Sequence, residues 1–469
     1  MFKILLLTLL LFCNLVACVS INKNNDFTKQ KSLRLKNNLL YKVIKNEDSK
    51  NSCYLRLKVK AGVLMQDPQE NGMAHAIQHL AFRSPEVTNF LLKNNLSLQA
   101  DDNAITNNED TIYSLDLNNC SDDTIKEAFS VLTHFAFGIK FNDHLITKEK
   151  LILNNEQIND SSMQQEISQK MLNKLYSGTN IANNSLLGDF ESRNRFNIKN
   201  LQDFYHKWYR IDNMQLLVAG DININLVNTL IKDNFNTIKK PEMKLPEISF
   251  HKPDYKHPFF IINNPDINNE IEVILSMQPK LIVQESFEQK YLKDKEIFDL
   301  VLSMINQQLI ENVKNQNRSF APEVWGKYYY GEYSEFYFST NTKTNELKES
   351  FIKDFSIIKE ALKNGFSDIE LKNAIGERKK SLQNTIDEET SLNPYFVDLL
   401  LQDIENNKPT WQKEHQSFLI NILDQITLKD CLISLKNTLK NGNRFLFAIG
   451  DIKEDQESVD ILVDTMNSL

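Results

Sequence analysis

The sequence predicts an α+β protein of two homologous α/β-roll lobes, each with a mainly antiparallel sheet packed against helices. Three observations support this fold class. A ten-residue motif at 213–222 returns at 443–452, an offset of 230 residues. Strand-like and helix-like segments are interleaved, and several strands follow one another directly, which favours antiparallel sheets over a doubly wound fold. Four of the eleven prolines fall at 241–258, between the halves.

Periodicity places the individual elements. Alternating apolar and polar residues predict strands at 54–61, 111–117, 271–276 and 328–338. Apolar residues at helical spacing predict helices at 124–137, 148–174, 296–313 and 352–362. In both halves a helical segment, 201–209 or 432–439, precedes the repeated motif, which predicts a buried strand ending in a Gly-Asp turn. We therefore expect domains at 35–240 and 259–469, joined by an extended proline-rich linker at 241–258.

Residues 1–18 have the pattern of an export signal. A basic start is followed by an apolar run at 4–12, which is too short to span a bilayer as a helix. The run leads to Leu15-Val16-Ala17-Cys18, which resembles a bacterial lipobox with Cys18 as the acylated residue. Ordinary signal cleavage near Ala17 is the alternative. We expect an exported chain, periplasmic or tethered to the outer membrane, that meets a membrane only through its signal or lipid anchor.

Charge and cysteine content narrow the class of protein further. The net charge is −8 and there is no basic block, which argues against a nucleic-acid partner. Beyond the signal only Cys53, Cys120 and Cys431 remain, too few for a disulfide scaffold. Cys53 lies just before one predicted strand and Cys120 just after another, so a disulfide forms if these strands are antiparallel neighbours. Cys431 is then a buried free thiol; three unpaired cysteines are the alternative.

The candidate chemistry lies at Gly72-Met-Ala-His75-Ala-Ile-Gln78-His79-Leu-Ala-Phe82. His75 and His79 are spaced i, i+4, so on a helix they share one face and can hold one zinc ion. Taken alone, the pair also fits two ordinary histidines on a helix.

The segment resembles the H-x-x-E-H signature of the inverzincins, which the pitrilysin/insulinase family carries as Gly-Leu-Ala-His-x-x-Glu-His-x-x-Phe. It matches this pattern at Gly72, Ala74, His75, His79 and Phe82, but Gln78 stands where the family has its general base. The resemblance covers nearly all of 35–469 and implies a two-lobed zinc-peptidase fold enclosing a substrate cleft.

The resemblance also implies the remaining site residues. Glu149 and Glu156 lie 70 and 77 residues after His79; Glu156 would complete one zinc site per chain, with water as fourth ligand, and Glu149 would support it. A surface glutamate pair is the alternative. Segment 98–106 resembles the family's edge strand, which implies that Asn103, Ala104 and Thr106 bind extended peptides.

The second half departs from the active members of the family. They supply an arginine and a tyrosine from this half; here Lys314 or Arg318 could stand for the arginine, and no tyrosine lies at the expected distance before Trp325. This half has no histidine pair, so we expect no second zinc site.

Three functions remain open from the sequence. Gln78 can hydrogen-bond a water but cannot accept its proton, which favours a catalytically impaired or inactive peptide-binding subunit. Such a subunit would work beside an active homologous subunit or as a homodimer. The alternatives are an active zinc metalloendopeptidase of the cell envelope and a structural envelope lipoprotein with a vestigial site.

Overall fold

A computed structural model describes residues 32–160, 163–177, 180–246, 259–263, 270–278, 289–314, 321–329, 333–343, 346–388, 392–402, 404, 413–440, 443–450 and 463–464. The expected export signal with Cys18, Arg318 and the linker residues 247–258 lie outside these described residues. Among the described helices, none combines the length and the apolar character that a membrane span requires.

The first half contains a six-stranded sheet. Its strands are β1 (Leu33–Arg34), β2 (Leu40–Lys45), β3 (Cys53–Val59), β4 (Ala104–Thr106), β5 (Thr111–Leu117) and β6 (Met214–Gly220), in the order β1-β2-β6-β3-β5-β4. All neighbours are antiparallel except β2 and β6. The repeated motif forms β6, which is buried along its whole length, as the unbroken apolar run predicts.

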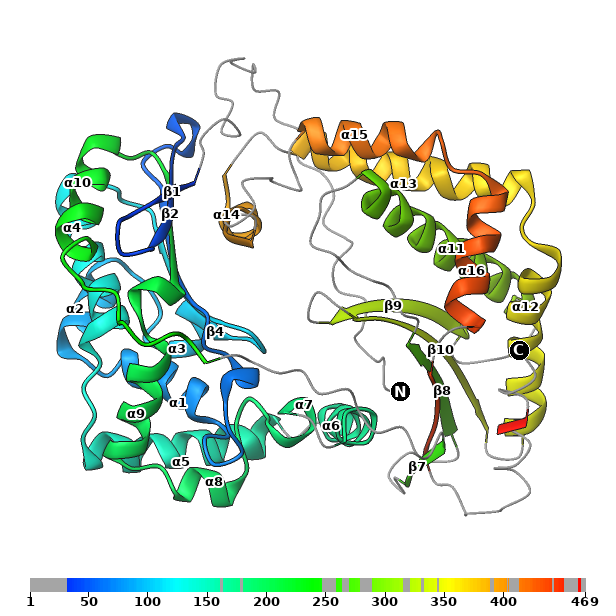
Figure 1. Cartoon of the computed structure of the whole chain (residues 1–469), viewed down its shortest axis with the longest axis horizontal. Coiled ribbons are helices and arrows are strands. Elements are labelled where there is room, and N and C mark those ends of the chain that lie inside the picture. The colour runs from blue at the N-terminus through cyan, green and yellow to red at the C-terminus, as the bar shows by residue number, and fades with distance from the viewer. Residues whose placement is uncertain are drawn as a thin grey trace.

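The second half repeats this sheet with five strands. They are β7 (Phe259–Asn263), β8 (Glu270–Gln278), β9 (Glu323–Tyr329), β10 (Tyr333–Lys343) and β11 (Asn443–Gly450), in the order β7-β11-β8-β10-β9. Strand for strand this matches β2-β6-β3-β5-β4, and again only one pair, β7 and β11, is parallel. The predicted fold class is confirmed: helices pack on two mainly antiparallel sheets (Figure 1).

Among the described residues the first half of the chain forms ten α-helices and the second half forms six. The first set is α1 (Met73–Ala81), α2 (Pro85–Lys93), α3 (Ala100–Asn103), α4 (Asp122–Thr133), α5 (Asp143–Asp160), α6 (Met163–Leu175), α7 (Asn180–Asn183), α8 (Phe190–Asn194), α9 (Ile198–Trp208) and α10 (Ile224–Phe235). The second set is α11 (Gln289–Val313), α12 (Leu347–Asn364), α13 (Asp368–Glu388), α14 (Pro394–Gln402), α15 (Lys413–Leu423) and α16 (Leu428–Lys440).

Two predicted elements are wrong in their extent. The segment 148–174 forms two helices, α5 and α6, rather than one. The segment 328–338 was expected to be one strand, but it covers the end of β9 and the start of β10, two antiparallel neighbours. Aromatic residues occur on both strands, so the aromatic run at 328–338 does not mark the reversal between them.

Each half lends one helix to the sheet of the other half. Helix α14, from the second half of the chain, buries Phe396, Val397 and Leu400 against the first sheet at Ile44 and Leu217. Helix α6, from the first half, packs Leu175 against the second sheet, in a cluster with these residues: Tyr176, Ile262, Ile274, Tyr337, Phe445, Phe447 and Ile449. Figure 1 shows α14 beside the first sheet and α6 beside the second. Buried apolar area therefore connects the two halves in both directions.

The predicted disulfide is confirmed. Strands β3 and β5 are antiparallel neighbours with Cys53 opposite Leu117, which brings Cys120 beside Cys53. The two form a disulfide with Cα atoms 5.9 Å apart. Cys431 is a buried free thiol, as expected.

Candidate metal centre

Helix α1 carries the centre of the site. Gly72 precedes it with φ +89°, a left-handed backbone conformation, and the Leu187 carbonyl lies 2.7 Å from where a Cβ would stand; only glycine fits there without strain. The side chain of Gln66 accepts a hydrogen bond from the Ala74 amide at 3.0 Å, inside the first turn. All residues of α1 are buried, so its polar side chains must find partners within the protein.

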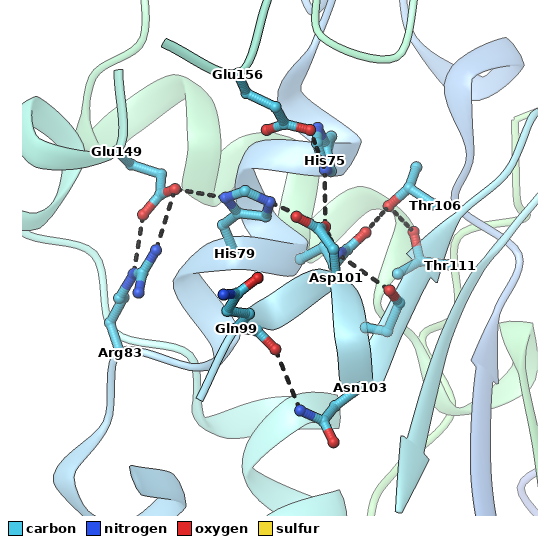
Figure 2. Close-up of polar contacts among 12 residues, drawn as sticks. His75, His79, Arg83, Gln99, Asp101, Asn103, Thr106, Thr111, Glu149 and Glu156 are labelled. Atoms are coloured by element: carbon cyan, nitrogen blue, oxygen red, sulfur yellow. Dashed lines mark hydrogen bonds and ion pairs between the residues drawn. The ribbon is translucent and has the colours of Figure 1, made fainter. Parts of the chain in front are cut away.

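Four side chains converge beside α1. The Nε2 atoms of His75 and His79 lie 3.3 Å and 3.2 Å from the same carboxylate oxygen, Oδ1 of Asp101. Glu156, on α5, places its Oε1 atom 4.0 Å from His75 Nε2. One ligand atom from each of these residues lies within 4.8 Å of the others, and Figure 2 shows the four side chains meeting at one point.

Glu149 and Arg83 orient His79 from its other side. His79 Nδ1 lies 2.6 Å from Glu149 Oε1, and Arg83, just after α1, donates to the same carboxylate from Nε at 3.0 Å and Nη2 at 3.4 Å. With its Nδ1 proton directed to Glu149, a neutral His79 turns the lone pair of Nε2 toward the cluster. Glu149 thus contacts one histidine of the cluster, and the family resemblance implies a supporting role for it.

Gln78 is fully buried and both ends of its amide have partners. Its Oε1 atom accepts from the Thr106 hydroxyl at 2.6 Å. Its Nε2 atom donates to Asp101 Oδ1 at 2.8 Å and to the Ala104 carbonyl at 3.4 Å. An amide held in this way orients Asp101 and β4, but it has no basic group that could take a proton from water.

The carboxylates make the cluster attractive to a cation. Burial lowers the pKa of His79, but its hydrogen bonds to Asp101 and Glu149 outweigh burial and raise that pKa to about 9. Hydrogen bonds from His75 and His79 hold the pKa of Asp101 far below its usual range. Burial raises the pKa of Glu149, yet His79 and Arg83 together lower it below its ordinary value. Negative charge therefore persists at the point where the imidazoles meet.

The residues expected to bind peptide lie close to this centre. Ala104 and Thr106 are in β4, the edge strand of the first sheet, as the sequence predicts. Asn103 is in the helical turn α3 instead, and its amide donates to the carbonyls of Ser97 and Gln99 at 2.8 Å and 3.2 Å. Within the described residues Asn103 is thus part of the support of this turn. Lys314 follows α11 and is exposed.

Sequence reasoning missed two residues of the site, Asp101 and Arg83. Asp101 lies in the segment compared with the family's edge strand, but nothing in Asp101-Asp102 indicates which carboxylate points inward, because that depends on the single turn α3. Arg83 could have been found: it lies four residues after His79, one helical turn further along the same face.

The donor set fits zinc. Imidazole nitrogens and carboxylate oxygens are ordinary zinc ligands, and His79 has the carboxylate partner that zinc-binding histidines typically have. His75, His79 and Glu156, the three ligands predicted from the sequence, would hold the ion, and Asp101 lies within the same set of atoms.

Similarity to known proteins agrees with this site. Residues 41–189 match the family model described as insulinase (peptidase family M16), and residues 195–377 match the peptidase M16 inactive domain. The chain belongs to peptidase family M16. This zinc-protease family implies zinc as the cofactor.

The M16 chain resembles several zinc proteases. It is 30% identical over 259 residues to "Probable zinc protease PqqL" of Haemophilus influenzae, covering 51% of this chain and 28% of that protein. Its identity to the Escherichia coli protein of the same name is 21% over 460 residues, covering 94% and 48%. The crystal structure of the first half of the periplasmic protease PqqL from Escherichia coli superposes with a TM-score of 0.81 at 19% identity, covering 94% and 96%. The chain thus spans about half or less of these curated relatives.

Proposed function

We propose that this M16 protein is a zinc-binding, catalytically impaired subunit that holds extended peptides. The observation that carries the proposal is the buried amide of Gln78, which lies between the two histidines and is hydrogen-bonded at both ends. A bound zinc ion would polarise a carbonyl and acidify a water molecule. The protein must supply the proton acceptor, and an amide in place of a carboxylate forfeits roughly 10²–10⁴-fold in rate.

Peptide holding is supported by the free edge of β4. This strand pairs with β5 alone among the described residues, and its Ile105 side chain is 54% exposed. An extended peptide can add to such an edge through backbone hydrogen bonds. The sheet order also places this edge next to the metal cluster, because Thr106 of β4 bonds Gln78 of α1.

A second subunit is part of the proposal. The chain covers 48% of the length of Escherichia coli PqqL and resembles the first half of that protease in structure. We propose that this chain works beside an active homologous subunit or a second copy of itself. Escherichia coli PqqL is a periplasmic protease, which supports an exported location for this chain, and Cys18 remains the proposed lipid attachment point.

Peptide cleavage and binding by the purified protein test the proposal. We expect a labelled extended peptide to bind with zinc present, and to be cleaved no faster than in a chelator-treated sample. Ile105→Lys should weaken binding, because charge on an edge strand blocks pairing; Leu92→Lys, at another exposed apolar residue, is the control. Chelator-sensitive cleavage that His75→Ala abolishes would instead favour the active metalloendopeptidase. Absence of both zinc and peptide binding would favour the structural lipoprotein.

A double variant tests the missing base directly. Gln78→Glu alone would set a carboxylate against Asp101, whose oxygen lies 2.8 Å from Gln78 Nε2, so it is combined with Asp101→Asn. We expect the pair to raise chelator-sensitive cleavage by about 10²-fold over Asp101→Asn alone. An unchanged rate with zinc still bound would place the limiting defect at another group.

A further inference from the structure

We propose that Asp101 is a fourth protein ligand of the metal, so that the site is closed by His75, His79, Glu156 and Asp101 and carries no exchangeable water. This inference rests on the zinc-binding part of the proposed function. It replaces the water expected from the sequence with a carboxylate of the chain itself. A closed site with four protein ligands is typical of structural zinc, whereas a catalytic site keeps an open position.

The distances around Asp101 carry the proposal. Atoms bound to one four-coordinate zinc at about 2.0–2.1 Å lie roughly 3.3 Å from each other. Asp101 Oδ1 lies 3.3 Å and 3.2 Å from the Nε2 atoms of His75 and His79. By this measure Asp101 is better placed than Glu156, whose oxygen is 4.0 Å from His75 Nε2.

The hydrogen bonding of His79 adds a second argument. Its Nδ1 atom is 2.6 Å from Glu149, so Nε2 is the ring nitrogen that faces the cluster, where it lies 3.2 Å from Asp101 Oδ1. A metal ion bound there would replace the proton that otherwise joins Nε2 to this oxygen. The same cation would satisfy His75 Nε2, which approaches the same oxygen.

The surroundings hold Asp101 in this position. Turn α3 is fixed from behind by Asn103, whose amide bonds the Ser97 and Gln99 carbonyls, and by Ser97, which accepts from the Gln99 amide at 3.1 Å. From the front, Gln78 donates to Asp101 Oδ1. A glutamate at position 78 would repel this carboxylate, so the glutamine and Asp101 form a matched pair. Gln78 is then a positioning residue for a ligand.

Cobalt substitution tests whether the site is closed. The full chain is loaded with Co²⁺, and its visible spectrum is recorded during titration with thiocyanate, an anion that binds cobalt only at an open position. We expect no spectral change for the wild type. Asp101→Asn, which removes a charged ligand with little change of shape, should show a saturable change. Asp102→Asn, which removes the same charge from the neighbouring residue, should behave as wild type.

Zinc affinity gives an independent measurement. Competition with a chromophoric chelator should show at least about a tenfold loss of affinity for Asp101→Asn and none for Asp102→Asn, since even supporting residues of metal sites are worth 10–100-fold. A wild-type spectrum that responds to thiocyanate would overturn the fourth ligand while leaving zinc binding and the proposed function intact. Unchanged affinity in Asp101→Asn would also overturn it. A wild type that binds neither metal would remove both proposals. Because thiocyanate is tested on the wild type, the inference can be refuted even if a variant misfolds.

Discussion

The two halves of the molecule have sheets of the same topology. They differ in the helix that follows the equivalent strands β3 and β8. Strand orders β2-β6-β3-β5-β4 and β7-β11-β8-β10-β9 correspond strand for strand. Between β3 and β4 the chain forms α1, whose buried face presents His75, Gln78 and His79. Between β8 and β9 it forms α11, which buries Phe298, Val301, Leu302, Met304 and Ile305.

The comparison shows that this sheet topology forms with or without a cluster of metal-ligating side chains beside it. In the second half the corresponding helix contributes apolar side chains to the core, and its buried charge, Glu296, is neutralised by Arg378 at 2.8 Å and 2.7 Å. In the first half several imidazole and carboxylate groups meet, with Arg83 bonded to Glu149 and Arg193 near Glu156, and their ligand atoms lie close enough together to hold a cation. A few polar residues on a common scaffold thus separate a metal centre from a packed core.

Removing one histidine should have the largest effect, because it tests whether the metal binds at the cluster of the first half. Wild-type protein should hold about one equivalent of zinc, and His75→Ala should hold less than about a tenth of that, because a ligand is lost from the cluster. Elemental analysis after zinc loading measures both. His206→Ala, at an exposed histidine of α9, should keep its zinc. Zinc retained by His75→Ala would mean that the metal binds elsewhere.

The disulfide allows the stabilities of the two sheets to be compared, since Cys53 and Cys120 both lie in the first half. Their bond closes a loop of 67 residues, which is worth about 4 kcal/mol in the chain-entropy model. We expect Cys53→Ser/Cys120→Ser to lower amide-exchange protection in β3 and β5 by that order while leaving β8 and β10 unchanged. Exchange mass spectrometry resolves the two sheets. Equal loss in both would show that the halves unfold together.

The exchanged helix α14 tests how far one half stabilises the other. Phe396→Ala, 6% exposed in the wild type, should cost about 3 kcal/mol. The loss should fall on β3 and β6 of the first sheet, although the residue belongs to the second half of the chain. Tyr395→Ala, at a neighbour that is 63% exposed, is the matched control. Unchanged protection of β6 would argue against a stabilising contact between α14 and this sheet.

The smallest expected effect is a pH dependence of the folding stability of the second half. Burial, and next the nearby charge of Glu323, raise the pKa of Glu272 from 4.5 to about 7. Since the folded pKa lies above the unfolded one, the folded state gains stability at low pH and loses it as pH rises toward 7. Glu272→Gln should remove this loss and stabilise the second half by about 2 kcal/mol at pH 8.

Denaturant unfolding at pH 5 and pH 8 measures the difference. Glu349→Gln, at an exposed residue of α12, serves as control and should leave the dependence in place. An equal pH dependence in the wild type and in Glu272→Gln would contradict the assignment.

The sequence predicts most of the fold because most strands of both sheets have a recognisable local pattern of apolar and polar residues. The duplicated motif marked β6 and β11, and Thr111–Leu117 was placed to the residue. The reversal between β9 and β10 is not predicted, because aromatic residues continue from one strand into the next. The partners of α6 and α14 were also missed: the sequence shows which residues of a helix are apolar, but not which sheet they cover.

The site, like the fold, contains some residues that the sequence predicts and others that it does not. His75 and His79 follow from their i, i+4 spacing on one helix, and the family resemblance implies Glu149 and Glu156, which lie two helical turns apart. Asp101 does not, because its position depends on the turn α3 and on Gln78, which is 23 residues away in the chain. Residues joined by a helix can be aligned from sequence, whereas a ligand brought in by a loop requires the folded structure.

The exchange of α6 and α14 has a consequence for dissecting the protein. A fragment ending at the linker would carry α6 without the second sheet and would leave the apolar surface of Ile44, Leu217 and Ala219 without its cover. Such a fragment should aggregate when expressed alone, and so should its complement. Co-expressed, the two pieces should find each other and co-purify, so that a split chain would behave as a heterodimer whose subunits are tied by one helix each.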